Sequence, residues 1–155
     1  CQSCYAVAKA LEGIKGVNPA VTVFPAISRV SAVFPLVRHG ENVSDNFGIT
    51  ASGGTPLAPA LWWVLQTLHA QAEDRKITLI LTDGVPDAVP PCKYALRQAE
   101  RLGVEIYGIG IKSNAVSQLL PQHSRVITTL QELAPAMFEM LQTALLRGGS
   151  HDRTR

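Results

Sequence analysis

Two short segments carry the side chains that could do chemistry in this sequence. Residues 53–56 (GGTP) place the hydroxyl of Thr55 beside two glycines, and residues 78–87 (TLILTDGVPD) carry the carboxylate of Asp83 directly after an apolar run. Hydroxyl, carboxylate and water oxygens are the ligands that Mg²⁺ and Mn²⁺ prefer, and neither segment contains a cysteine or a histidine. Glycine allows the backbone to approach a ligand closely. The two segments therefore predict an oxygen-lined site for a hard divalent cation.

The pattern around these segments predicts the elements that position them. Apolar residues recur at three and four positions over residues 56–72, which predicts an amphipathic helix with Thr55 as its N-cap and Pro56 as its first residue. Residues 77–81 form a continuous apolar run, as expected for a parallel strand that is covered on both faces. Asp83 follows the end of that strand, and open α/β sheets bind ligands at the carboxyl ends of their strands.

The rest of the chain alternates between predicted strands and helices. Helices are expected at residues 5–14, 93–102, 115–120 and 130–145, and strands at residues 21–27, 30–37, 104–111 and 125–128. The strands 21–27 and 30–37 are separated by a tight connection, which favours an antiparallel hairpin. The alternation predicts a doubly wound, Rossmann-like α/β fold with a mostly parallel sheet, helices on both faces and one antiparallel edge strand.

The combination of motifs resembles the von Willebrand factor type A (VWA) family, in which a GGT segment opens a helix and a later strand ends in TDG. In that family the threonine and the aspartate belong to a metal-ion-dependent adhesion site, so the resemblance implies metal-binding roles for Thr55 and Asp83. The longer segments GGTPLAPAL, LTDGVPD, YGIGI and RVITTLQELAPAMFEMLQTAL are most similar to the VWA domains of bacterial cobalt-chelatase-type subunits and related proteins that partner AAA+ ATPases.

One family motif has no counterpart here. The DxSxS motif, which supplies an Asp and two Ser at the end of the first strand, is not found before or near Cys1. The resemblance therefore implies a VWA domain over residues 1–147 that is truncated at its N-terminus, followed by a flexible polar tail at residues 148–155. Mg²⁺ or Mn²⁺ is expected to bind weakly and to keep mostly water ligands. A strand is expected to be missing between the strands at 21–27 and 77–81.

The resemblance implies a non-enzymatic interaction module. A protein partner would complete the cation's coordination with an acidic side chain, and the assembly is expected to contain an AAA+ ATPase or to be of the metal-chelatase type. Gly54 and Gly84 are expected to border the partner. Asp87 is expected either at the rim of the crevice, where it biases the partner's charge, or as part of a loop and helix cap. A magnesium-dependent phosphoryl-transfer enzyme of haloacid-dehalogenase type and a metal-free structural VWA domain are the alternatives.

Composition narrows the classes of partner and the compartment. The 155 residues are 46% hydrophobic and 17% charged, which is typical of a globular domain. The net charge of +2 and the scattered Lys and Arg residues argue against a nucleic-acid partner. The longest apolar runs are the length of strands, so no membrane span is expected. Three cysteines are an odd number without the density of a disulfide framework, which favours the reducing cytoplasm.

Some conspicuous residues are interpreted as structural. Cys1 and Cys4 form a CxxC at a helix start, but the strand that precedes such a motif in redox proteins is missing, so both are expected on a buried helix face. Cys92 has no His nearby in sequence that could act as a base, so a nucleophilic role is not expected. Trp62 and Trp63 project about 100° apart on a helix. One of them is therefore expected to be partly exposed as a partner contact, or to pack under a loop.

Overall fold

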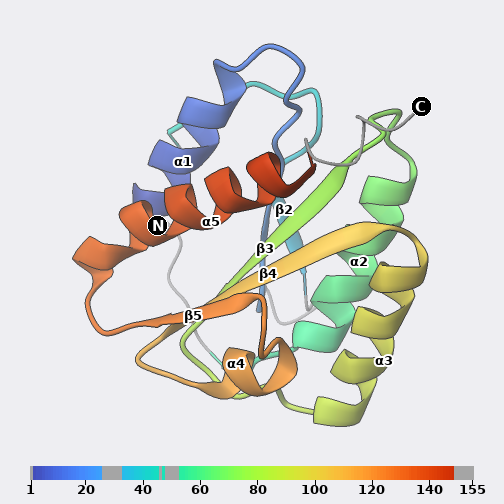
Figure 1. Cartoon of the computed structure of the whole chain (residues 1–155), viewed down its shortest axis with the longest axis vertical. Helices are drawn as coiled ribbons and strands as arrows, with labels where there is room; N and C mark the ends of the chain where they lie inside the picture. Colours follow the sequence, from blue (N-terminus) through green and yellow to red (C-terminus); the bar gives the residue numbers. More distant parts are fainter. Residues whose placement is uncertain (1, 26–32, 46, 48–52, 149–155) are drawn as a thin grey trace.

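A computed structural model gives the structure of the chain (Figure 1), and it describes residues 2–25, 33–45, 47 and 53–148. The elements follow one another in the order α1 (Gln2–Glu12), β1 (Val21–Val23), β2 (Phe34–Val37), α2 (Leu57–His69), β3 (Lys76–Thr82), α3 (Val89–Arg101), β4 (Val104–Ile111), α4 (Ala115–Leu119), β5 (Ser124–Ile127), the 3₁₀ helix η1 (Leu130–Glu132) and α5 (Leu133–Gly148). Each predicted helix and strand is therefore present, with shifts of a few residues at the ends.

The strands form two sheets within the described residues. β3, β4 and β5 are parallel and adjacent in that order, whereas β1 and β2 form a separate antiparallel pair. The antiparallel pairing confirms the predicted hairpin partners, although its connection, residues 26–32, lies outside the described residues. Within the described part of the chain the antiparallel pair is not joined to the parallel sheet, at the place where a strand was expected to be missing. No strand there lies between β1 and β3, so β3 pairs with β4 alone.

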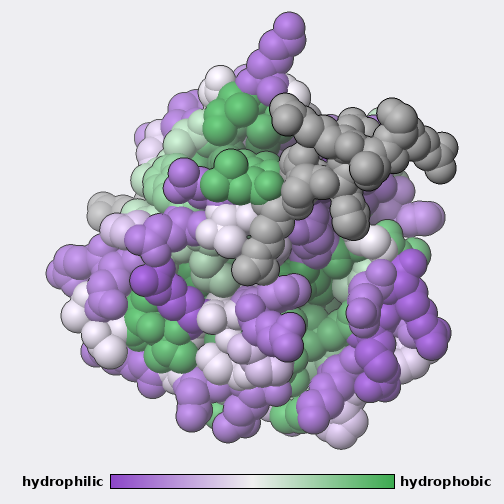
Figure 2. All heavy atoms as spheres, in the orientation of Figure 1, coloured by the Kyte–Doolittle hydropathy of each residue, from purple (hydrophilic) through white to green (hydrophobic). Residues whose placement is uncertain are grey.

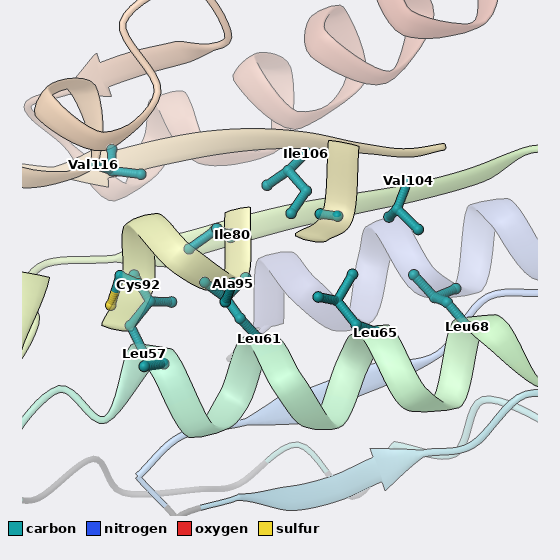
Figure 3. Packing of buried hydrophobic residues seen from close by; sticks show 12 residues of the cluster. Leu57, Leu61, Leu65, Leu68, Ile80, Cys92, Ala95, Val104, Ile106 and Val116 are labelled. Atoms are coloured by element: carbon teal, nitrogen blue, oxygen red, sulfur yellow. The ribbon is translucent and has the colours of Figure 1, made fainter. Parts of the chain in front are cut away.

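Helices cover both faces of the parallel sheet. α2 and α3 lie on one face, while α1 and α5 lie on the other (Figure 1). Ile80 and Ile106 face the first side and pack with the leucines of α2 (Figure 3), whereas Leu79 and Ile109 face the second side and pack with α5. This alternation follows from the two-residue period of a strand. The two-sided layering agrees with the expected doubly wound arrangement.

β4 is the central strand, and its glycines leave space for α4. A Cβ atom on Gly108 would collide with Val116 of α4, and one on Gly110 would collide with the carbonyl oxygen of Ser113. Both positions therefore need glycine because of close packing, which is one of the reasons for glycine inside a strand.

The ends of two helices differ from the prediction. α3 begins at Val89 rather than at Lys93, because Pro90 and Pro91 fit the first turn of a helix, where the missing N–H costs no hydrogen bond. The last predicted helix is divided into η1 and α5. Thr129 and Glu132 form a capping box at the start of η1, in which the Glu132 carboxylate accepts a hydrogen bond from the Thr129 backbone N–H at 2.9 Å.

Arg75 ties the end of α5 to the sheet. Its Nε and Nη2 donate to the two carboxylate oxygens of Glu105 at 2.6 and 3.0 Å. The same guanidinium donates to the carbonyl oxygens of Ala144 and Leu145 in the last turns of α5. A cation near a helix C-terminus interacts favourably with the last carbonyl groups and with the helix dipole. Arg75 thus joins β3, β4 and α5 through one side chain.

Part of the apolar surface is exposed. Hydrophobic side chains gather over the C-terminal half of α5 on the face shown in Figure 2. Leu145 and Leu146 of α5 are exposed. In the described residues, no helix combines the length and the apolar character that a bilayer crossing requires.

Candidate functional site

The first part of the candidate site is the turn that follows β3. Thr82, the last residue of the strand, is buried, and its hydroxyl accepts a hydrogen bond from the Gly84 backbone N–H at 3.1 Å and donates to the Gly84 carbonyl oxygen at 3.3 Å. These bonds fix the turn in which Asp83 lies. The Asp83 side chain is exposed at the carboxyl edge of the sheet, and no hydrogen bond or ion pair holds its carboxylate in the described part of the molecule.

The second part is the loop that precedes α2, and Asp87 joins it to the first. The backbone N–H of Thr55 donates to Asp87 Oδ1 at 2.7 Å, and the backbone N–H of Asp87 donates to the Thr55 carbonyl oxygen at 3.0 Å. This reciprocal pair links residues that are 32 positions apart in the sequence. The two predicted segments therefore lie in contact, as expected for segments at the same edge of the sheet.

Two glycines allow the loops to approach each other. A Cβ atom on Gly54 would lie 2.6 Å from Asp87 Oδ1, and one on Gly84 would collide with Thr55 Oγ1. Both predicted glycines thus lie at the contact between the loops, which leaves no room for a larger side chain. Gly53 has a different role, because its φ of +99° is one that residues with a side chain rarely adopt.

Thr55 does not cap α2, contrary to the prediction. The helix begins at Leu57, its N-cap residue is Pro56, and no side chain makes a capping hydrogen bond. Pro56 has φ −75° and ψ 60°, an inverse γ-turn in which the Leu57 N–H donates to the Thr55 carbonyl oxygen at 2.8 Å. This turn directs the Thr55 hydroxyl to Gly84 instead of to the helix N-terminus. The hydroxyl is therefore not used for capping and lies beside the turn that contains Asp83.

Asp87 has a structural role that the sequence did not indicate. α3 has Ala88 as its N-cap and lacks a capping side-chain hydrogen bond, so the helix-cap alternative for Asp87 is wrong. The reason is that Oδ1 of Asp87 is bound to the Thr55 N–H across the site. Its side chain is exposed, and an effect of Asp87 on a partner's charge stays a prediction.

The donor set is compatible with a hard cation that keeps several water ligands. Thr55 contributes a hydroxyl and Asp83 a carboxylate, both oxygen donors of the kind that Mg²⁺ and Mn²⁺ bind. The close contact of Gly84 with Thr55 Oγ1 places the hydroxyl next to the residue that follows Asp83. Among the described residues, no group of three or more His, Cys, Asp or Glu side chains could hold a metal ion. The described part of the candidate site thus offers few protein ligands.

Neither described cysteine is activated. Cys92 is fully buried, and its thiol donates to the Ala88 carbonyl oxygen at 3.1 Å. Burial, and secondarily the charge of Asp87, raise the pKa of the Cys92 thiol above its usual value. Burial also raises the pKa of Cys4, whereas redox-active thiols have lowered values. Cys1 lies outside the described residues.

Comparison with known proteins supports the fold. No model of a known protein family matches the chain, and no curated protein matches it. Among solved structures, it is similar to the crystal structure of the manganese-loaded TRAP protein of Plasmodium vivax, with a TM-score of 0.68 and 15% sequence identity over 90% of this chain. The chain covers 63% of the length of that structure. The two motif segments and this structural likeness together lead to the conclusion that the chain has a VWA-like α/β fold.

Proposed function

We propose that this protein is a metal-ion-dependent protein interaction module. A divalent cation, Mg²⁺ or Mn²⁺, binds weakly to Thr55 and Asp83 and keeps water in its other positions. A partner protein replaces one of these waters with an acidic side chain. Gly54 and Gly84 line the approach to the cation, and the module itself catalyses no reaction.

The observation that carries this proposal is the contact between the two loops. The Thr55–Asp87 hydrogen bonds hold the loops together, and the Thr55 hydroxyl lies against Gly84, next to Asp83. The hydroxyl is not used for helix capping and the carboxylate is exposed, so both oxygens are available to a cation. An exposed cation with exchangeable water ligands attracts a carboxylate and selects it by coordination geometry.

The comparison adds independent support for a divalent cation. The TRAP protein to which the fold is similar was crystallised in a manganese-loaded form. We therefore choose Mn²⁺ as the first cation to test, because its paramagnetism allows direct detection.

We further propose that the partner belongs to an AAA+ ATPase or metal-chelatase-type complex and that the protein acts in the cytoplasm as an adaptor. The support for the partner is the resemblance of GGTPLAPAL and LTDGVPD to cobalt-chelatase-type VWA domains. The support for the compartment is that Cys4 and Cys92 are free thiols. Co-purification of a tagged full-length protein with an AAA+ ATPase, lost on Asp83→Ala, tests the partner.

The metal site is tested by titrating Mn²⁺ and following the electron paramagnetic resonance signal of the free ion. We expect saturable binding with a Kd on the order of 1 mM, typical of sites with few carboxylate ligands. Asp83→Ala and Thr55→Val should each abolish saturation, whereas Thr55→Ser, which keeps the hydroxyl, should retain it. Asp74→Ala is the matched control and should leave binding unchanged. Asp74, like Asp83, is an exposed aspartate next to β3, but it lies before the strand, whereas Asp83 lies after it.

Three results would contradict the proposal. Absence of saturable binding to the unmodified protein would leave the metal-free structural alternative. Binding that is equal in the unmodified protein, Asp83→Ala and Thr55→Val would place the cation elsewhere. Turnover of p-nitrophenyl phosphate that needs Mg²⁺ and Asp83 would favour the phosphoryl-transfer alternative over a binding module.

A further inference from the structure

Helix α2 carries large apolar side chains on two opposite faces. One face packs into the core between α3 and the sheet (Figure 3), and its residues are Leu57, Leu61, Leu65 and Leu68. The other face is exposed, and its residues recur at spacings of three and four: Pro59, Trp62, Trp63 and Gln66. A helix that is apolar on both sides is normally covered on both sides. In this structure the second face is open, with Trp62 36% and Trp63 37% exposed.

The exposed face of α2 forms one wall of a groove, and β2 with the residues beside it forms the other. We call it the tryptophan groove. It has a volume of about 600 Å³ and is lined by Pro59, Trp62, Trp63 and Gln66 from α2 and by Val33, Phe34, Pro35 and Arg38 from the β2 side. Phe34 is 47% exposed. The sequence led us to expect one tryptophan to be exposed, but both line this groove.

The ring of Trp62 contacts the ring of Tyr94 on α3. The two ring centroids are 5.9 Å apart, and Cζ of Arg97 lies 5.9 Å from the centroid of the Tyr94 ring. A ring that is already oriented loses little conformational entropy when a ligand binds. Tryptophan and arginine are also the residues that most often dominate binding energy at protein interfaces.

The charge of the groove is positive. Arg38 is the single charged residue among those that line it, and its side chain is exposed. The nearby Glu41 accepts a hydrogen bond from the backbone N–H of Arg38 at 2.9 Å, and none of the ion pairs among the described residues includes the Arg38 guanidinium. A ligand with an acidic side chain would therefore complement the groove at this end.

The backbone of β2 disfavours a ligand that adds a strand. Pro35 lies within this four-residue strand and has no N–H to donate to a neighbouring chain. A ligand must therefore be recognised mainly through side-chain surfaces. Grooves lined by aromatic rings bind proline-rich segments, because the polyproline II helix is extended, already ordered and presents flat apolar rings.

We propose that the tryptophan groove binds a proline-rich, acidic segment of a partner protein in the polyproline II conformation. Prolines of the segment stack on Trp62, Trp63 and Phe34, and an acidic side chain pairs with Arg38. This contact is separate from the cation at Thr55 and Asp83 and needs no metal. It would let the module hold a partner through two surfaces at once.

The test uses a synthetic peptide that repeats Pro-Pro-Glu-Pro, titrated into the full chain in EDTA while tryptophan fluorescence is recorded. We expect saturation with a Kd on the order of 0.1 mM, as is typical of a small transient interface. Trp63→Ala should weaken binding about tenfold or more. Arg38→Glu should weaken binding of this peptide and strengthen binding of the Pro-Pro-Lys-Pro counterpart. Lys15→Glu, which reverses an exposed charge outside the groove, should change neither.

Three results would overturn this proposal. One is a lack of saturation up to about 5 mM peptide, which is far weaker than small interfaces of this kind. Another is a lack of specificity. It would appear either as equal binding of an Ala-Ala-Glu-Ala repeat or as equal binding of the acidic and basic peptides by the Arg38→Glu protein. The third is a concentration-dependent dimer in sedimentation experiments that Trp63→Ala dissociates, which would assign the groove to a second copy of the chain. Because EDTA is present, none of these outcomes depends on the cation site.

Discussion

Space, more than backbone conformation, explains why glycine occupies positions 54 and 84. Neither residue has the positive φ that Gly53 has, yet a Cβ at either position would enter the opposite loop. Gly84 faces the Thr55 hydroxyl and Gly54 faces the Asp87 carboxylate. The two glycines therefore let the oxygen-bearing side chains of one loop approach the backbone of the other.

Gly84→Ala tests this contact. The added methyl group would collide with Thr55 Oγ1, so we expect a loss of about 1–3 kcal/mol in the free energy of unfolding. In a Thr55→Ala background the nearest remaining Thr55 atom, Cβ, lies 3.5 Å from the new methyl, an ordinary contact distance. The cost of Gly84→Ala should therefore fall by at least half when measured by urea unfolding of the four proteins of the cycle. Equal costs in both backgrounds would mean that the two residues are not in contact.

The predictable elements are those in which one local signal dominates. β4 was predicted at its observed bounds, because Val104–Ile111 is rich in valine, isoleucine and tyrosine and is bounded by turn residues. The start of α2 was misplaced by one residue, because Thr-Pro is a common helix start and the inverse γ-turn at Pro56 arises from tertiary contacts with Asp87. The two hydrogen bonds between Asp87 and Thr55 join positions that are 32 residues apart, and no local sequence pattern reveals such a pair. Thr55 and Asp83 could be named as candidates because each lies beside a recognisable element boundary, Thr55 before α2 and Asp83 after β3.

The order of the strands was only partly predictable. Periodicity indicates where strands occur, but the neighbours of a strand depend on which segments are available to pair with it. The antiparallel β1–β2 pair follows from chain proximity, whereas the separation of this pair from β3 follows from the absence of a strand between them in the described residues.

The Arg75–Glu105 pair makes the attachment of α5 dependent on pH. Hydrogen bonding from Arg75 lowers the pKa of Glu105. Because the folded pKa lies below the unfolded value of about 4.3, the pair's stabilisation is fully present above about pH 4.3 and is lost as pH falls through the folded pKa. The two side chains are 31% and 35% exposed, so solvent screening limits the stabilisation to about 0.5–1 kcal/mol.

Glu105→Gln should therefore destabilise the protein by about 0.5–1 kcal/mol at pH 7, and the difference from the unmodified protein should shrink towards zero near pH 3. Glu100→Gln is the matched control, since Glu100 is an exposed glutamate of α3 outside the ion pairs found among the described residues. Urea unfolding over this pH range measures both. A penalty for Glu105→Gln that is independent of pH would show that the carboxylate charge contributes nothing.

In the whole molecule, the two proposed binding surfaces lie at different places along helix α2. The cation site lies at the carboxyl end of β3, before the chain enters α3 (Figure 1), and the tryptophan groove lies between the exposed face of α2 and the β2 side. α2 connects them, because its N-terminus follows Thr55 and its exposed face lines the groove. A partner that binds both surfaces would gain affinity from their linkage without any change in either contact.

The most direct test of the cation site is a Mn²⁺ titration followed by nuclear magnetic resonance. Mn²⁺ broadens signals from nuclei close to it, so it locates the ion without any mutation. We predict that substoichiometric Mn²⁺ first broadens the backbone amide signals of Gly54, Thr55, Asp83 and Gly84, and that excess Mg²⁺ restores them. Broadening that begins at His39 or His123, or that spreads evenly over the surface, would contradict a cation site at the end of β3.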